Sequence, residues 1–190
     1  MKAWNKQYLP TPPHIIDRML EQMYKSEESC DQVGGWMVLE PSAGDGRIAD
    51  KIMELWPTSI VDCIEQDPNA IKVLNEKEHF VISNDLLEFF PANKAESCEL
   101  ILYDRVVMNP PFAMWADIKH TRKAFSLLKP GGRLIGIMSE QAFLSSEKEP
   151  REFCEWFLEH AGIDRMLEAR TFMYRRIPIL TRMVIIDKEE

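Results

Sequence analysis

Short apolar runs alternate with amphipathic helical patterns along most of the chain. Seven apolar runs predict strands, and they lie at 36–40, 59–65, 80–83, within 100–108, 133–138, 163–169 and 181–187. Four helical patterns lie at about 47–55, 67–75, 116–128 and 150–160. Strands that alternate with helices pair in parallel through right-handed crossovers. The two last strands have no helix between them, which predicts an antiparallel finish.

This order predicts an α/β fold of the Rossmann-like kind, with a mostly parallel seven-stranded sheet, an antiparallel last strand and helices on both faces. In such sheets, ligands bind in the crevice at the carboxyl ends of the strands. The polar and glycine-rich residues at predicted strand ends are 40–46, Glu65, Asp85 and 109–112. We therefore expect the functional site where these segments meet.

Length and composition indicate one globular domain over 1–190, in which 1–34 form an arm and helix beside the site. Of the 190 residues, 45% are hydrophobic and 28% are charged, which excludes a disordered chain. The start of the chain lacks the apolar stretch of a signal peptide, and apolar runs elsewhere are short. We therefore expect a cytoplasmic protein without a membrane segment.

Cysteine, histidine and charge narrow the possible ligands. The four cysteines and four histidines are scattered without metal-ligand spacing, so we expect reduced thiols and no metal. The net charge of −8 argues mildly against a general polyanion binder. Four arginines nevertheless lie between 170 and 183 without an acid, and they form either a basic island or an ordinary solvated loop.

The segment 40–46, Glu-Pro-Ser-Ala-Gly-Asp-Gly, follows the first predicted strand and opens a helix. Glu65 follows about twenty residues later at the end of the second strand, where an acid can accept hydrogen bonds from ribose hydroxyls. The turn is not GxGxxG, and Glu40 and Asp45 would repel a pyrophosphate. S-adenosyl-L-methionine carries a sulfonium and an ammonium but no phosphate, so it suits this acid-rich turn.

With these motifs in this order, the chain resembles the class I methyltransferases that methylate amino groups, and above all the compact N6-adenine DNA methyltransferases with an Asn-Pro-Pro-Phe motif found in phages and mobile elements. The resemblance implies S-adenosyl-L-methionine as cofactor, Glu65 as its ribose acid and Asp85 as its adenine contact. Tyr8 to Pro13 resemble a segment that contacts the methionine end, unless they are a packing arm. The cofactor residues implied are Tyr8, Thr11, Pro12, Glu40, Pro41, Ser42, Ala43, Gly44, Gly46, Glu65, Gln66, Asp85, Leu86 and Asn109.

The tetrad Asn109, Pro110, Pro111 and Phe112 follows the fourth predicted strand, and it is the catalytic site that the resemblance implies. The lone pair of an adenine N6 is delocalised into the ring, so an enzyme must draw it back by accepting the two amino hydrogens. The Asn109 oxygen and the Pro110 carbonyl can accept them, and the prolines fix the direction of that carbonyl. Phe112 would stack on the base, and no general base is needed before transfer.

A target in duplex DNA must rotate out of the stack, which requires phosphate contacts. Phe112, Phe172, Arg175 and Arg176 are the expected substrate-binding residues, although Phe172 and Tyr174 could equally pack in the core. Little of the chain remains for reading a target sequence. We therefore expect relaxed specificity, a very short target, a single-stranded substrate or a protein partner.

Three rival functions share some of these features. The same tetrad serves enzymes that methylate a protein glutamine or an RNA base, and the charge of −8 suits a protein substrate. A non-catalytic cofactor-binding subunit of a methyltransferase complex is disfavoured by the intact tetrad. A nicotinamide-dependent oxidoreductase is disfavoured by the glycine pattern.

Overall fold

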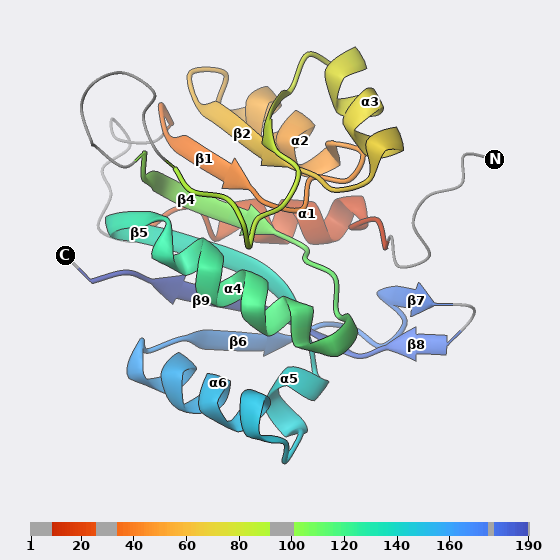
Figure 1. Ribbon diagram of the computed structural model, residues 1–190, viewed down its shortest axis with the longest axis vertical. Helices are drawn as coiled ribbons and strands as arrows, with labels where there is room; N and C mark the ends of the chain where they lie inside the picture. The colour runs from red at the N-terminus through yellow and green to blue at the C-terminus, as the bar shows by residue number, and fades with distance from the viewer. Residues whose placement is uncertain (1–8, 26–33, 92–100, 175–176, 190) are drawn as a thin grey trace.

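A seven-stranded sheet with the order β3-β2-β1-β4-β5-β9-β6 forms the centre of the protein (Figure 1). The computed structural model describes residues 9–25, 34–91, 101–174 and 177–189. The strands of the sheet are β1 (Met37–Glu40), β2 (Ile60–Ile64), β3 (Phe80–Ser83), β4 (Tyr103–Met108), β5 (Leu128–Ser139), β6 (Ile163–Met166) and β9 (Thr181–Asp187). Strands β1 to β5 pair in parallel, while β9 is antiparallel to β5 and β6. The predicted Rossmann-like fold with an antiparallel last strand is confirmed.

Helices cover both faces of this sheet and create two separate cores. The helical segments are α1 (Pro13–Glu21), α2 (Arg47–Leu55), α3 (Pro68–Glu76), η2 (Ala113–Trp115), α4 (Ala116–Ser126), α5 (Gln141–Leu144) and α6 (Lys148–Glu159). The first three pack on one face, and α4, α5 and α6 pack on the other. Among the described residues, no helix is long and apolar enough to cross a bilayer.

Alternation along the central strands assigns their side chains to the two cores. In β4, Val107 packs with α1 and α2, while Val106 and Met108 pack with α4 and α6. In β5, Ile135 packs in the core of α1 and α2, while Leu134 packs in the core of α4 and α6. Successive side chains of a strand point to opposite faces, so a strand buried on both sides is a continuous apolar run. The continuous apolar runs therefore predicted the central strands.

The main differences from the sequence-based prediction are the start of β5 and an additional hairpin, while β6 also ends at Met166 rather than at 169 and the short helix α5 was not predicted. Strand β5 begins at Leu128 rather than at 133, because Leu128 pairs with Tyr103 and the expected turn is an irregularity around Gly131, whose φ is +72°. A two-stranded hairpin of β7 (Phe172–Tyr174) and β8 (Ile177–Ile179) was not predicted. Strands of three residues are too short to show a clear two-residue period.

Candidate active site

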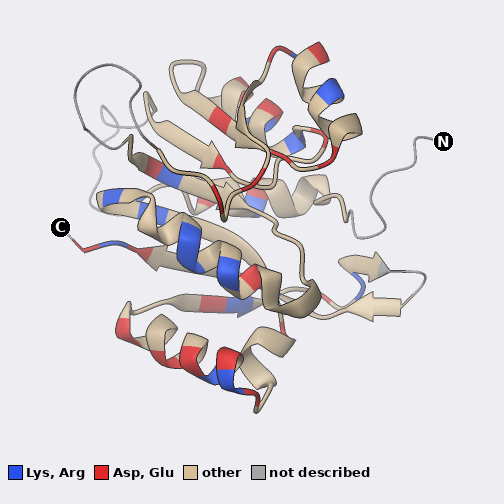
Figure 2. Cartoon of the chain, in the orientation of Figure 1, with Lys and Arg blue, Asp and Glu red and all other residues tan. Residues whose placement is uncertain are grey.

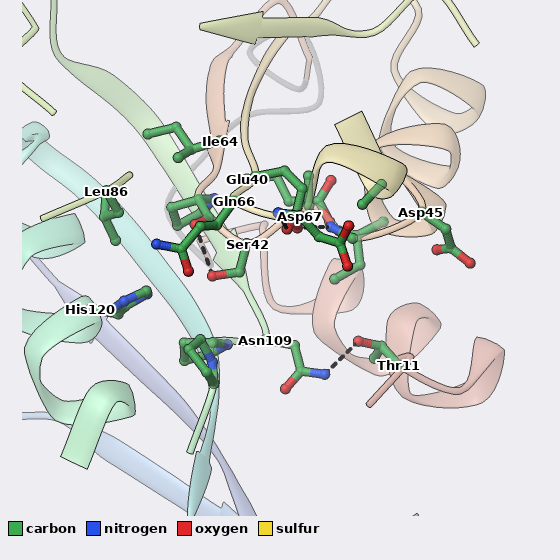
Figure 3. Close-up of a pocket in the computed structure, with 18 of the residues that line it drawn as sticks. Thr11, Glu40, Ser42, Asp45, Ile64, Gln66, Asp67, Leu86, Asn109 and His120 are labelled. Carbon is green, nitrogen blue, oxygen red and sulfur yellow. Dashed lines mark hydrogen bonds between the residues drawn. The ribbon is translucent and has the colours of Figure 1, made fainter. Parts of the chain in front are cut away.

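A cavity of about 270 Å³ opens at the carboxyl ends of β1, β2 and β4. Four segments that are distant in sequence surround it, namely 9–11, 40–48, 64–70 and 109–112. A fifth segment, 84–87, follows β3 (Figure 3). The volume is close to the ~300 Å³ at which small-molecule pockets begin. The cavity therefore lies where the strand order predicted it.

The turn after β1 is shaped by positive φ angles and by one buried carboxylate. Gly44 and Gly46 have φ of +55° and +80°, a region that a Cβ disfavours. A Cβ on Gly46 would also lie 2.8 Å from Leu74. Glu40, 1% exposed, accepts a hydrogen bond of 2.8 Å from the Ala49 amide in the first turn of α2. Glu40 thus ties the end of β1 to the start of the helix.

Glu65 is held at the end of β2 by two backbone amides. Its carboxylate accepts hydrogen bonds from the Gly44 amide at 2.6 Å and from the Asp67 amide at 2.8 Å. Each carboxylate oxygen has two lone-pair sites, so both can still accept a hydroxyl. The predicted ribose acid therefore lies in the cavity with a fixed orientation.

The cavity is rich in acids at its glycine-turn end. Glu40, Asp45 and Glu65 line it together with the guanidinium of Arg47, which hydrogen-bonds Asp45. Burial raises the pKa of the Glu40 carboxyl well above its usual range, and the neighbouring acids raise it further. Such surroundings favour a ligand that carries positive charge.

Asn109 follows β4, and its side-chain amide joins the N-terminal segment to the sheet. Its nitrogen donates to the Leu9 carbonyl and to the Thr11 hydroxyl, both at 3.0 Å (Figure 3). A backbone carbonyl can only accept, so the nitrogen must occupy this side of the amide. The Asn109 oxygen is buried and finds no hydrogen-bond donor among the described residues. It is therefore an oriented acceptor on the cavity wall.

Phe112 lies next to the hairpin. Its ring meets that of Phe172 edge to face, with centroids 6.2 Å apart and planes at 83°. Phe172 is 2% exposed and belongs to the core, so it supports Phe112 from behind. The core alternative therefore holds for Phe172, and it offers no free aromatic face. The side chain of Tyr174 lies outside the described residues.

Most of the sequence-predicted residues meet at this cavity. The predicted residues that line it are Thr11, Glu40, Pro41, Ser42, Ala43, Gly44, Glu65, Gln66, Asp85, Leu86, Asn109, Pro110, Pro111 and Phe112. Pro12 and Gly46 do not line it, and they are the N-cap residues of α1 and α2. Tyr8, Arg175 and Arg176 lie outside the described residues.

The arginine island is smaller than the sequence suggested. Arg182 lies on β9, is 19% exposed in its side chain, and pairs with Asp164 at 2.6 Å and Glu140 at 3.4 Å. Arg170 is exposed in the turn before β7. Figure 2 shows basic residues on α4 as well, and acidic residues on α6. Arg182 is therefore part of an ion-pair network within the fold, and the sequence pattern alone did not indicate its acidic partners.

His120 lines the cavity and was missed by sequence reasoning. It lies on α4, eleven residues after Asn109, and its ring points into the cavity near Leu86 (Figure 3). Its buried Nδ1 has no hydrogen-bond partner within the described part of the chain. Burial lowers the pKa of His120, while the nearby Asp85 carboxylate opposes this effect. The helical spacing from the tetrad was the only available signal, and it does not distinguish a site residue from a surface one.

Comparison with known families identifies the class. The model of the methyltransferase small domain matches residues 21–152. Since this match covers more than half of the 190 residues, the chain belongs to that family. It is a class I methyltransferase, and its cofactor is S-adenosylmethionine. Among curated proteins, none matches the sequence.

Solved structures share the fold at low sequence identity. A Pyrococcus horikoshii protein provisionally assigned as an RNA methyltransferase aligns with a TM-score of 0.68 at 23% identity, over 99% of this chain and 89% of its own. TrmN from Thermus thermophilus aligns with a TM-score of 0.59 at 19% identity, over 93% of this chain and 48% of TrmN. A chain of a type I R-M system aligns with a TM-score of 0.67 at 17% identity, over 94% of this chain and 42% of its own length. This chain therefore spans about half or less of the latter two.

The described residues fit the cofactor. The acids at the glycine turn suit its cationic groups, and Glu65 presents free acceptor capacity to ribose hydroxyls. The buried Asn109 oxygen and His120 Nδ1 have no partner within the described ranges, and both lie on the cavity wall, where a bound cofactor would supply one. Among the described residues, no cluster of His, Cys, Asp or Glu could hold a metal ion.

Proposed function

We propose that this protein transfers a methyl group to the exocyclic N6 amino group of adenine in DNA. The observation that carries the proposal is the Asn109 amide, whose nitrogen is held by Leu9 and Thr11 while its buried oxygen has no donor among the described residues. An amino group is the natural partner of an acceptor so placed.

The residues of the tetrad have distinct roles in this proposal. The Asn109 oxygen and the Pro110 carbonyl accept the two amino hydrogens, which concentrates the lone pair on the target nitrogen. Pro110 and Pro111 restrict the backbone and fix the direction of that carbonyl. When bound, S-adenosylmethionine would supply the methyl group from its sulfonium and leave as S-adenosylhomocysteine, and the cationic nitrogen then loses one proton to water. The residues contribute mainly by positioning, which accounts for a large share of the rate in such transfers.

Phe112 supplies the face on which the target base stacks. Phe172 braces its ring edge-on, so the ring is held in place before the substrate arrives. Next to Phe112, Met114 and Trp115 have positive φ angles of 54° and 58°, and Met114 is 88% exposed. Strained backbone of this kind concentrates at functional sites. The tetrad thus continues into an apolar loop at the substrate side.

The choice of DNA rests on the resemblance of the motifs and on the structural likeness to a chain of a type I R-M system. RNA is the second candidate, since one similar structure is provisionally assigned as an RNA methyltransferase. In either case, the target base must leave its stack to reach the cavity. We infer that the β7–β8 hairpin contacts the nucleic acid beside Phe112 and that a partner chain provides further target recognition.

Labelled cofactor distinguishes these substrates directly. The protein is incubated with tritiated S-adenosylmethionine and with duplex DNA, single-stranded DNA, RNA or protein, and the products are digested and separated. We expect label in N6-methyladenine from DNA. Label in an RNA nucleoside or in glutamine, with none in DNA, would overturn the proposed substrate.

Two asparagine variants test the proposed chemistry. Asn109→Ala removes the acceptor, and we expect a loss of about 100-fold or more in the transfer rate. The binding of S-adenosylhomocysteine should change far less. Asn75→Ala alters an exposed asparagine in α3 outside the cavity and should behave like the wild type. Unchanged transfer by Asn109→Ala would place the chemistry elsewhere.

A further inference from the structure

The glycine turn after β1 contains a peptide unit that is held at both of its ends. Asp45 lies between Gly44 and Gly46, whose φ angles are both positive. The peptide between Asp45 and Gly46 donates its N–H to the Ala43 carbonyl at 2.8 Å. Its carbonyl accepts a hydrogen bond from the Lys77 ammonium at 2.7 Å. Lys77 therefore restrains a turn that lies 32 residues earlier in the sequence.

Lys77 is linked to a buried histidine through one aspartate. Lys77 is the C-cap residue of α3, and its ammonium also pairs with the Asp50 carboxylate in the first turn of α2. The other Asp50 oxygen lies 2.7 Å from Nε2 of His79, whose side chain is only 3% exposed. The Asp50 amide donates to the Gly46 carbonyl at 2.7 Å. The C-terminal end of α3 is thus joined both to the glycine turn and to the start of α2.

Glycine makes this turn possible and also leaves it free to move. Glycine adopts positive and negative φ with similar ease, so a peptide beside a glycine can rotate when nothing holds it. The Gly44 amide donates to the Glu65 carboxylate, and Asp45 lines the cavity. A rotation of the 45–46 peptide would therefore disturb the cavity wall. Ordering a mobile turn during binding lowers affinity, whereas a turn that is already ordered avoids this cost.

We propose that Lys77 is a positioning residue for S-adenosylmethionine, which acts on the cofactor through the glycine turn. Lys77 is not one of the residues that line the cavity. Its contact with the Asp45 carbonyl fixes the 45–46 peptide before the cofactor binds. This role concerns the cofactor alone, so it does not depend on the proposed DNA substrate.

Charge alone predicts the opposite effect. S-adenosylmethionine carries a sulfonium, an ammonium and a carboxylate, so its net charge is positive. A nearby ammonium repels such a ligand, and removing the Lys77 charge should then leave the affinity unchanged or raise it. If Lys77 acts by holding the turn, its removal lowers the affinity instead. The sign of the change therefore separates positioning from electrostatics.

Calorimetric titration with S-adenosylmethionine, in the absence of any methyl acceptor, measures this sign. We expect Lys77→Met to weaken binding by about fivefold, the value of one hydrogen bond at a partly exposed site. Lys77→Arg keeps the charge and a donor, and it should stay within about twofold of the wild type. Lys72→Met makes the same change of charge on α3 at an exposed residue outside the cavity lining. This control should bind the cofactor as tightly as the wild type or slightly more tightly.

Hydrogen exchange of the Gly46 amide in the free protein reports on the turn directly. Its protection should fall in Lys77→Met and persist in Lys77→Arg, because only the first variant releases the 45–46 peptide. Missing N6-methyladenine would refute the DNA assignment and leave both measurements unaffected.

Unchanged or tighter cofactor binding by Lys77→Met would overturn the proposal, as would unchanged protection of the Gly46 amide. An equal loss of affinity in Lys72→Met or in Lys77→Arg would overturn it as well. If Lys77→Met does not fold, as judged by thermal melting without ligand, Lys77→Gln takes its place, because it removes the charge and shortens the side chain.

Discussion

Thr11→Val tests whether the N-terminal segment orients the Asn109 amide for the proposed transfer. Thr11 is 3% exposed, and its hydroxyl accepts a hydrogen of the Asn109 amide at 3.0 Å. Valine has nearly the same shape but lacks the hydroxyl. The substitution therefore removes one of the two contacts that hold the amide nitrogen and leaves the contact with the Leu9 carbonyl at 3.0 Å.

The expected magnitude follows from that single contact. A neutral hydrogen bond contributes about 1 kcal/mol, which corresponds to roughly a fivefold change in an equilibrium. A flipped amide would set its oxygen against the Leu9 carbonyl, so the productive orientation of Asn109 stays preferred. We therefore expect about a fivefold fall in the transfer rate for Thr11→Val, much smaller than the loss for Asn109→Ala.

Single-turnover transfer at saturating cofactor measures this effect, because it reports the chemical step rather than product release. Thr11→Ser retains the hydroxyl and should stay within about twofold of the wild type. Affinity for S-adenosylhomocysteine is measured alongside, since Thr11 also lines the cavity. The reasoning is refuted if Thr11→Val transfers methyl groups as fast as the wild type, or if the serine variant is as slow as the valine variant.

Two further predictions concern stability. Burial raises the pKa of the Glu40 carboxyl, so the folded protein binds the carboxyl proton more tightly than the unfolded chain does. The free energy of unfolding therefore falls as the pH rises above the unfolded pKa of about 4.3. Glu40→Gln should therefore melt at a higher temperature than the wild type at pH 8, with no advantage near pH 4; a lower melting temperature at pH 8 contradicts this. Gly46→Ala, with φ of +80° and a new Cβ within 2.8 Å of a side chain, should cost about 2–4 kcal/mol in urea unfolding. Gly35→Ala, with φ of +67° and no atom within 4 Å, should cost only about 1 kcal/mol, and equal losses would show that the clash is relieved.

The fold and much of the site were predictable because they depend on local patterns. A strand buried on both faces needs a continuous apolar run, and a turn with positive φ needs glycine at positions such as Gly44 and Gly46. The strand ends then bring Glu65 and Asn109 to one edge of the sheet without further information.

The remaining features depend on contacts that no local pattern encodes. His120 lines the cavity because α4 is set against β5 by Asp117, and its neighbours in sequence do not indicate which way its ring points. Arg182 resembled a free cation until the sheet placed it beside Asp164 and Glu140. In both cases, the contact that places the side chain joins residues at least eighteen positions apart in the sequence.

The N-terminal segment connects the cofactor side of the cavity to the acceptor amide. Arg47 hydrogen-bonds Asp45 of the glycine turn and donates to the Thr11 carbonyl at 3.1 Å. Thr11 and Leu9 in turn hold the Asn109 amide. The glycine turn and the acceptor amide are therefore positioned by one continuous series of hydrogen bonds through residues 9–11. In the proposed reaction, the methyl donor and its target must meet within a narrow range of distances and angles, and this shared support would preorganise the two sides together.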